Sequence, residues 1–129
     1  MNSLFADATV ISVYTRAQAL EDGGLIDVTE MAKEAGFRVP VALTADVWGD
    51  CVAWDNKVEE APQDEAGRLW DVLTMATVAA RCSEGDRVSF SVLRIPSRGD
   101  EPEPVQLVMH IGPDDQSESV ITIMQPGEG

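Results

Sequence analysis

Basic residues are scarce in this chain of 129 residues. Nine lysines and arginines stand against 23 aspartates and glutamates, which gives a formal net charge of −14. A protein that binds nucleic acid directly needs a basic surface to neutralise phosphates, and an anionic membrane surface attracts the same charge. The composition therefore argues against both as direct ligands. It favours a basic protein partner, or a surface charge that serves solubility alone.

Long apolar runs and cysteines are also few. The chain has no run of about 18 apolar residues, and its first residues lack the basic and apolar pattern of a secretory signal. We therefore expect a cytoplasmic protein. The two cysteines, Cys51 and Cys82, lie among apolar neighbours in predicted helices. We expect both thiols to be reduced and buried, and a disulfide between the helices is the alternative where the compartment allows it.

Residues that carry catalysis or bind metals are sparse. His110 is the only histidine, and no other histidine or cysteine stands at ligand spacing, so we expect no metal site. We also expect no cofactor, because the sequence has no phosphate-binding loop, dinucleotide fingerprint or calcium loop. His110 alternates with the apolar residues of its strand, which predicts a surface position. We expect that the protein is not an enzyme. A dispersed Ser-His-Asp site is the alternative, because its members need not be adjacent in sequence.

One clear helical period is present. Residues 64–82 carry apolar side chains at spacings of three and four, which predicts an amphipathic α-helix. The residues on this face are Leu69, Trp70, Val72, Leu73, Ala76, Ala79 and Ala80. Asp64 is a suitable N-cap, and Arg81 lies in the last turn, where the helix dipole favours a cation. We predict that this is the central core helix, with Trp70 buried.

The first half of the chain predicts three shorter helices. They cover residues 16–22, 30–35 and 45–54, and each follows a threonine that can cap it: Thr15, Thr29 and Thr44. Residues 37–43 alternate apolar and other side chains, but Pro40 cannot donate a ladder hydrogen bond. This segment is therefore predicted to be an edge strand or no strand. A short strand near residues 9–14 is a further candidate.

The second half changes to a period of two. Strands are predicted at residues 88–95, 105–111 and 120–124, with a bulge near residues 92–93, where Leu93 falls out of phase. This order of elements predicts a single domain, residues 1–129, of the α+β class. Its expected architecture is N-terminal helices packed on a C-terminal three-stranded antiparallel β-meander, with one extra N-terminal strand as an option.

An acidic patch is the strongest functional signal. Its five carboxylates lie on the third predicted helix and the loop after it, and they are Asp46, Asp50, Asp55, Glu59 and Glu60. Lys57 is the only basic residue among them. The patch is either a solvated face or a partner-binding surface that competes with nucleic acid for a basic groove, because spaced carboxylates can replace phosphates. The three tryptophans, Trp48, Trp54 and Trp70, are expected in the core, and Trp54 is an alternative partner contact.

Three stretches carry a resemblance to other proteins: YTRAQAL at residues 14–20, AGFRVPVALT at residues 35–44 and DEAGRLWDVL at residues 64–73. From about residue 11 to residue 124 the chain resembles a family of small uncharacterised acidic accessory proteins of bacterial plasmids and phages, a domain of unknown function. The resemblance implies a mobile genetic element in bacterial cytoplasm that faces host defence, and it supplies no catalytic residues. Small acidic proteins of such elements often resemble inhibitors of CRISPR or restriction systems.

These observations lead to one hypothesis and two alternatives. We expect a non-enzymatic, anti-CRISPR-like inhibitor whose acidic patch binds the basic surface of a host defence complex and competes with target DNA. The first alternative is a plasmid or phage accessory adaptor that binds a partner through an apolar helix face. The second is a hydrolase with a dispersed site. A steep salt dependence of binding favours the acidic competitor over the apolar adaptor.

Overall fold

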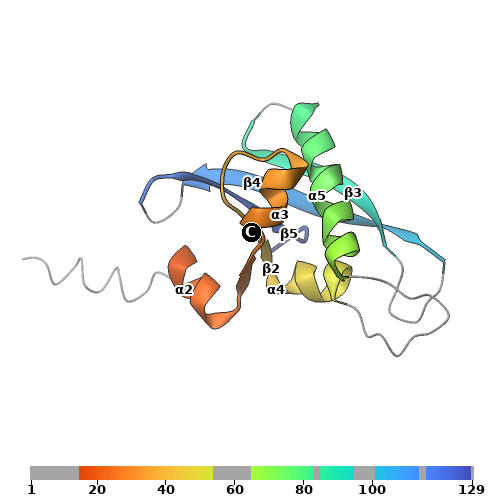
Figure 1. Cartoon of the computed structure of the whole chain (residues 1–129), viewed down its shortest axis with the longest axis horizontal. Coiled ribbons are helices and arrows are strands. Elements are labelled where there is room, and N and C mark those ends of the chain that lie inside the picture. The colour runs from red at the N-terminus through yellow and green to blue at the C-terminus, as the bar shows by residue number, and fades with distance from the viewer. Residues whose placement is uncertain (1–14, 54–64, 83–84, 95–100, 114–115, 129) are drawn as a thin grey trace, which may run out of the picture.

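The computed structural model describes residues 15–53, 65–82, 85–94, 101–113 and 116–128. The helices (Figure 1) are α2 (Arg16–Asp22), α3 (Thr29–Ala35), α4 (Ala45–Val47), the π-helical turn η1 (Trp48–Val52) and α5 (Glu65–Arg81). The strands are β1 (Leu25–Asp27), β2 (Val41–Thr44), β3 (Arg87–Arg94), β4 (Glu103–Pro113) and β5 (Ser119–Met124). The structure is α+β.

The described strands form one sheet in the order β1-β2-β5-β4-β3. β3, β4 and β5 are antiparallel neighbours, and β1 and β2 are antiparallel as well. β2 and β5 run parallel, with Val41 opposite Ile121 and Leu43 opposite Ile123. The last strand of the chain therefore lies in the middle of the sheet, between the N-terminal pair and the β3–β4 pair.

The predicted three-stranded antiparallel meander is wrong, because the sheet is mixed and has five strands within the described residues. β1 is only three residues long, too short to show a period of two, and β2 buries the consecutive residues Val41, Ala42 and Leu43 because it lies inside the sheet. β2 is also an inner strand, although residues 37–43 were expected to form an edge strand or none. Pro40 precedes β2, where its missing N–H interrupts no strand pairing, and its carbonyl accepts a hydrogen bond from Ile121 N at 2.9 Å.

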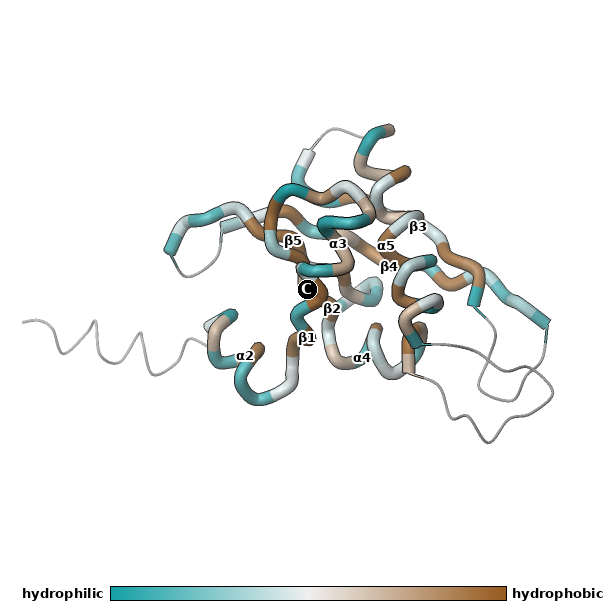
Figure 2. Tube along the Cα trace, in the orientation of Figure 1, coloured by the Kyte–Doolittle hydropathy of each residue, from teal (hydrophilic) through white to brown (hydrophobic). Residues whose placement is uncertain are grey.

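The main core lies between the sheet and one layer of helices. Figure 1 shows α5 in front of β3 and β4 with α3 beside it, and η1 also packs against α5. The largest fully buried side chains are Val41, Leu43, Val47, Val52, Val72, Leu73, Leu107, Met109 and Ile123. Figure 2 shows the hydrophobic segments gathered in the central strands and hydrophilic segments toward the periphery. Burial of this shared apolar layer holds the helices on the sheet.

Helix α2 reaches the opposite face of the sheet. Arg16 donates hydrogen bonds from Nη1 to Thr122 Oγ1 at 2.6 Å and from Nη2 to the Ile121 carbonyl at 3.0 Å. Thr122 alternates with the core residues Ile121 and Ile123 along β5, so its side chain lies on the face that points away from α5. Arg16 therefore joins α2 to this second face.

Several helix ends form as the sequence predicts. Thr15 and Gln18 form the expected capping box at the start of α2, since each side chain accepts a hydrogen bond from the other residue's backbone N–H. Thr44 Oγ1 accepts a hydrogen bond from Val47 N at 3.2 Å and caps α4. Gly36 ends α3 at φ 115°, a left-handed conformation that favours glycine.

Two other helix predictions are wrong. The hydroxyl of Thr29 does not cap α3; it donates to the Asp27 carboxylate and accepts from Val41 N, which ties the start of α3 to the neighbouring strands. The third predicted helix is not one regular α-helix. After one turn, Ala53 N donates to the Trp48 carbonyl at 2.8 Å, five residues back, which closes the π-helical turn η1.

Two residues that were predicted to be buried are exposed. Trp70 is 41% exposed on α5, and Cys82 is exposed immediately after that helix. Only one stripe of an amphipathic helix can face the sheet, and in α5 the stripe with Leu69 and Leu73 does so. The predicted bulge near residues 92–93 is also wrong, because β3 and β4 pair residue by residue along all of β3. Trp54 lies outside the described residues.

Among the described residues, no helix combines the length and the apolar character that a membrane crossing requires.

Candidate functional site

An apolar hollow lies between α5 and β3, and we call it the α5–β3 groove. It has a volume of about 520 Å³ and is lined by Trp70, Asp71, Thr74, Met75, Ser91, Val92, Leu93 and Pro104. Trp70 is 41%, Met75 40% and Leu93 68% exposed. Val78 is also exposed, and it lies one turn beyond Thr74 on the same side of α5. Four of the five large apolar side chains that are exposed in the described part of the chain therefore gather at or beside this groove.

The groove follows from the way α5 meets the sheet. The stripe of α5 with Leu69, Val72 and Leu73 is buried against the strands. The next flank of the helix carries Trp70 and Met75, which border the groove together with β3. Because β3 is the last described strand at this side of the sheet, no further described strand covers that flank.

Two of the five predicted partner-binding carboxylates lie in the described residues, and they differ. Asp46 is exposed on α4. Asp50 on η1 forms an ion pair with Arg94 of β3, and the same guanidinium contacts Glu103 Oε1 of β4 at 2.8 Å. The remaining three, outside the described residues, are Asp55, Glu59 and Glu60. The structure thus gives Asp50 an internal partner that joins η1 to the sheet, while Asp46 faces solvent.

A buried thiol and a buried guanidinium lie beside this ion pair. Cys51 is 3% exposed, and burial, followed by the negative charge of Asp50, raises the pKa of its thiol to about 11. Arg68 is 7% exposed; its Nε donates to the Val52 carbonyl at 3.0 Å, and burial lowers the pKa of its guanidinium. A thiol with a raised pKa stays protonated at neutral pH and is a poor nucleophile. The structure therefore gives Cys51 a packing role.

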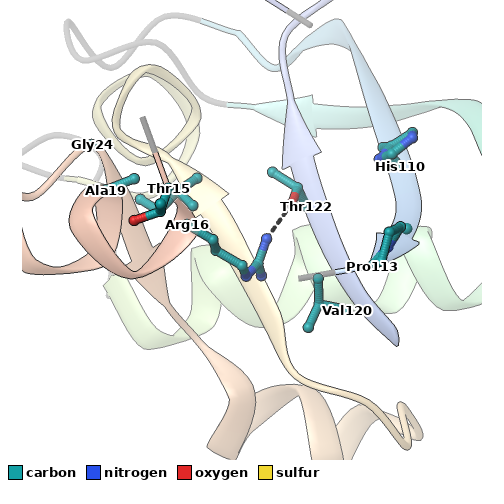
Figure 3. Close-up of a pocket in the computed structure, with 10 residues that line it drawn as sticks. Thr15, Arg16, Ala19, Gly24, His110, Pro113, Val120 and Thr122 are labelled. Carbon is teal, nitrogen blue, oxygen red and sulfur yellow. Dashed lines mark hydrogen bonds between the residues drawn. The ribbon is translucent and has the colours of Figure 1, made fainter. Parts of the chain in front are cut away.

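A second hollow, of about 420 Å³, lies between α2 and the second face of the sheet (Figure 3). Figure 3 shows Arg16 reaching Thr122 on β5, with His110 on the neighbouring strand β4. His110 is half-buried, and its ring lies over Gly112, where an added Cβ would come within 2.8 Å of His110 Cε1. The described residues that line this hollow include no serine, cysteine or carboxylate that could complete a triad with His110.

Among the described residues, histidine, cysteine, aspartate and glutamate side chains do not gather in groups of three or more that could hold an ion.

Sequence reasoning missed the α5–β3 groove because it assigned Trp70 to the core. The available signal was Leu93, whose apolar side chain breaks the alternation of β3. In the structure this residue keeps regular pairing with Pro104 and exposes its side chain. Such a groove is indicated by two features together. A strand carries an apolar residue on its solvent side, and a nearby helix carries an apolar residue outside the stripe that faces the core.

Comparison with known proteins identifies a family and no characterised relative. No curated protein and no solved structure matches the chain. A family of unknown function (DUF6573) matches residues 1–129, which is the whole of the chain. The chain therefore belongs to this family.

Proposed function

We propose that this protein is a non-enzymatic adaptor that binds a partner protein through the α5–β3 groove. One observation carries the proposal: Trp70, Met75 and Leu93, each at least 40% exposed, surround a single hollow of about 520 Å³. Large apolar side chains that gather on a surface are typical of interaction sites. Tryptophan and methionine are also enriched in the buried centres of protein interfaces.

The resemblance to accessory proteins of bacterial plasmids and phages supports a setting for this adaptor. In that setting it acts in the cytoplasm, on a host protein or on another protein of the same mobile element. The centre of the contact is apolar, so salt should weaken binding far less than it weakens binding of an acidic competitor.

Site-specific photo-crosslinking tests the proposal. A photoreactive amino acid replaces Met75 or Leu93 in the full-length protein, which is produced in a bacterial host. We expect both positions to give the same discrete crosslinked species. Leu20 on α2 is the matched control position, because it is apolar and 38% exposed but does not line the groove. The proposal fails if Met75 and Leu93 give no common species, or if Leu20 gives the same one.

A second candidate function is inhibition of a nucleic-acid-targeting defence complex by an anti-CRISPR-like acidic competitor. The net charge of −14 and the exposed side chain of Asp46 support it. Here the partner is the basic surface of the complex, and binding should weaken steeply as salt is raised. Measuring binding at two salt concentrations therefore separates this candidate from the apolar adaptor.

A further inference from the structure

We propose that the partner of the α5–β3 groove is an extended, basic segment that pairs with the free edge of β3 as an additional strand. This inference rests on the proposed function, because it names what fills the same groove. β3 ends the sheet: among the described strands it pairs with β4 alone, over the eight residues from Arg87 to Arg94. A strand edge of that length offers backbone donors and acceptors to another chain.

The register identifies the backbone groups on that edge. Ile111 N donates to the Asp86 carbonyl at 2.7 Å, so this opposed pair is a hydrogen-bonded pair of the antiparallel ladder. Such pairs alternate along the ladder with pairs whose N–H and C=O groups point away from the partner strand. When this alternation is continued along β3, the backbone N–H and C=O groups of four residues point away from β4: Arg87, Ser89, Ser91 and Leu93. Their backbone groups form the free edge.

Within its described residues, β3 shows none of three features that commonly block strand addition. Edge strands are commonly protected by proline, by a bulge or by charged side chains. β3 contains no proline, and its pairing with β4 is continuous. Its two charged residues, Arg87 and Arg94, stand at its ends, and Ser89 and Ser91 occupy the middle of the outward set. The composition and pairing of β3 therefore leave the centre of this edge suited to pairing.

The edge and the groove are the same surface. Ser91 and Leu93 belong to the outward backbone set, and both line the α5–β3 groove. Side chains of an added strand would alternate between its two faces. One set would meet the exposed flank of α5 at Trp70 and Met75, and the other set would lie on the opposite face with Leu93. Backbone pairing and apolar contact therefore call for one extended segment with alternating apolar residues.

Charge selects a basic segment over a second copy of this chain. Two copies, each with a net charge of −14, would repel each other. Arg94, at the end of β3, is already paired with Asp50 and Glu103. Asp71, in contrast, lines the groove and is exposed. The net negative charge and the nearby carboxylate of Asp71 thus steer a segment with lysine or arginine to the groove.

A designed peptide tests the inference on the full-length protein. The probe has about nine residues, the length of a long strand, and alternates leucine with lysine. We expect it to bind, and we expect amide exchange at Ser89, Ser91 and Leu93 to slow by about tenfold or more on binding. Two N-methylated versions of the peptide serve as controls, one methylated on its leucine amides and the other on its lysine amides. Alternate amides of a strand point to opposite edges, and only one edge of an added strand pairs with β3. One methylated version should therefore lose about tenfold or more in affinity, and the other should not.

Further variants separate this inference from the proposed function. Leu93→Ser should weaken peptide binding, because Leu93 packs against one set of the probe's side chains, either leucines or the aliphatic stems of lysines. Leu20→Ser is the matched control that should not weaken it. Binding that needs Leu93 but leaves the three amides unprotected, or that tolerates both methylated versions equally, overturns strand addition while the groove remains a binding site. A glutamate peptide that binds as well as the lysine peptide overturns the basic partner. Protection of the edge without peptide, together with a dimer in sedimentation, assigns the edge to a second copy and overturns the inference. Absence of lysine-peptide binding also overturns it.

Discussion

Cys51 makes the stability of the fold depend on pH. Burial, and then the charge of Asp50, raises the pKa of its thiol from an ordinary value of 9.0 to about 11. Between these values the unfolded chain releases a proton that the folded protein keeps, so unfolding becomes easier as pH rises. The contribution is complete below pH 9 and is lost as pH passes 11. We expect a loss of about 2–3 kcal/mol in unfolding free energy across this window.

Urea unfolding at several pH values between about 8 and 11 measures this effect. Cys51→Ala should lack this part of the pH dependence, whatever its stability at neutral pH. Cys82→Ser is the matched control and should retain it, because Cys82 is exposed. Identical pH profiles for the parent and Cys51→Ala would contradict the raised pKa.

The two cysteines should also differ in reactivity. Cys82 is exposed and Cys51 is buried, so a thiol reagent should modify Cys82 rapidly and Cys51 only slowly in the native protein. Mass spectrometry of the labelled protein over time gives both rates. Equal rates under native conditions would show that Cys51 is accessible, and addition of urea should make the rates converge.

The contribution of the ion pair between Asp50 and Arg94 to stability can be measured against Asp46, an exposed carboxylate on the neighbouring helix. Asp50 partners Arg94, whose Nε is buried and has no hydrogen-bond partner among the described residues, so Asp50→Asn leaves a guanidinium with one counter-charge fewer. We expect Asp50→Asn to lower the unfolding free energy by about 1–2 kcal/mol. Asp46→Asn removes the same charge from an exposed position and should change stability by less than about 0.5 kcal/mol. Equal effects in chemical denaturation would mean that the ion pair contributes nothing to folding.

Among the elements, α5 carries the largest share of the helical core. Leu73 is fully buried in it and Trp70 is 41% exposed. We expect Leu73→Ala to cost about 2–5 kcal/mol, because it leaves a cavity in packed core. Trp70→Ala should cost clearly less and should instead weaken partner binding. Denaturation midpoints of the two variants decide the order, and a larger loss for Trp70→Ala would place the tryptophan back in the core.

Elements with strong local signals could be predicted from the sequence. The helix after Thr15, the glycine end of α3 and the period of α5 follow from capping and amphipathic spacing, which depend on near neighbours. The π-helical turn η1 could not be predicted, because the wider turn closed by the bond from Ala53 N to the Trp48 carbonyl leaves the apolar pattern nearly unchanged. The function of Thr29 was missed for a related reason, since its bond partner Val41 belongs to a strand distant in sequence.

At the scale of the whole molecule, the sheet order and the groove depend on contacts between distant segments. In the parallel pair of β2 and β5, Val41 lies opposite Ile121, and the sequence of neither short strand indicates which strand it pairs with. The groove likewise needs Trp70 and Leu93 to meet across two elements. Periodicity predicts which side of an element is apolar, but the arrangement of the elements determines whether each apolar side chain is buried.

The net charge gives the acidic-competitor candidate its own test. Four carboxylates are neutralised, with Asp50 kept because it holds Arg94: Asp46, Asp55, Glu59 and Glu60. If the acidic patch occupies a basic groove, this variant should lose most inhibition of target-DNA binding by a host CRISPR complex, and the loss should be larger at low salt. The matched control neutralises four exposed carboxylates elsewhere, Glu21, Glu30, Glu34 and Glu101, and should inhibit as the parent does. Equal inhibition by both variants would reduce the patch to a solvated face.

The position of β5 has a consequence for biosynthesis. β5 is synthesised after the other described strands, yet it separates β2 from β4 and pairs with both. Until residue 124 has emerged, the nascent chain holds two part-sheets, each with an extra uncovered edge and half-exposed core residues. Such intermediates attract other chains and chaperones. The sheet can therefore close only after β5 has been synthesised, and we expect a chain truncated before Ser119 to expose two additional sheet edges and to aggregate.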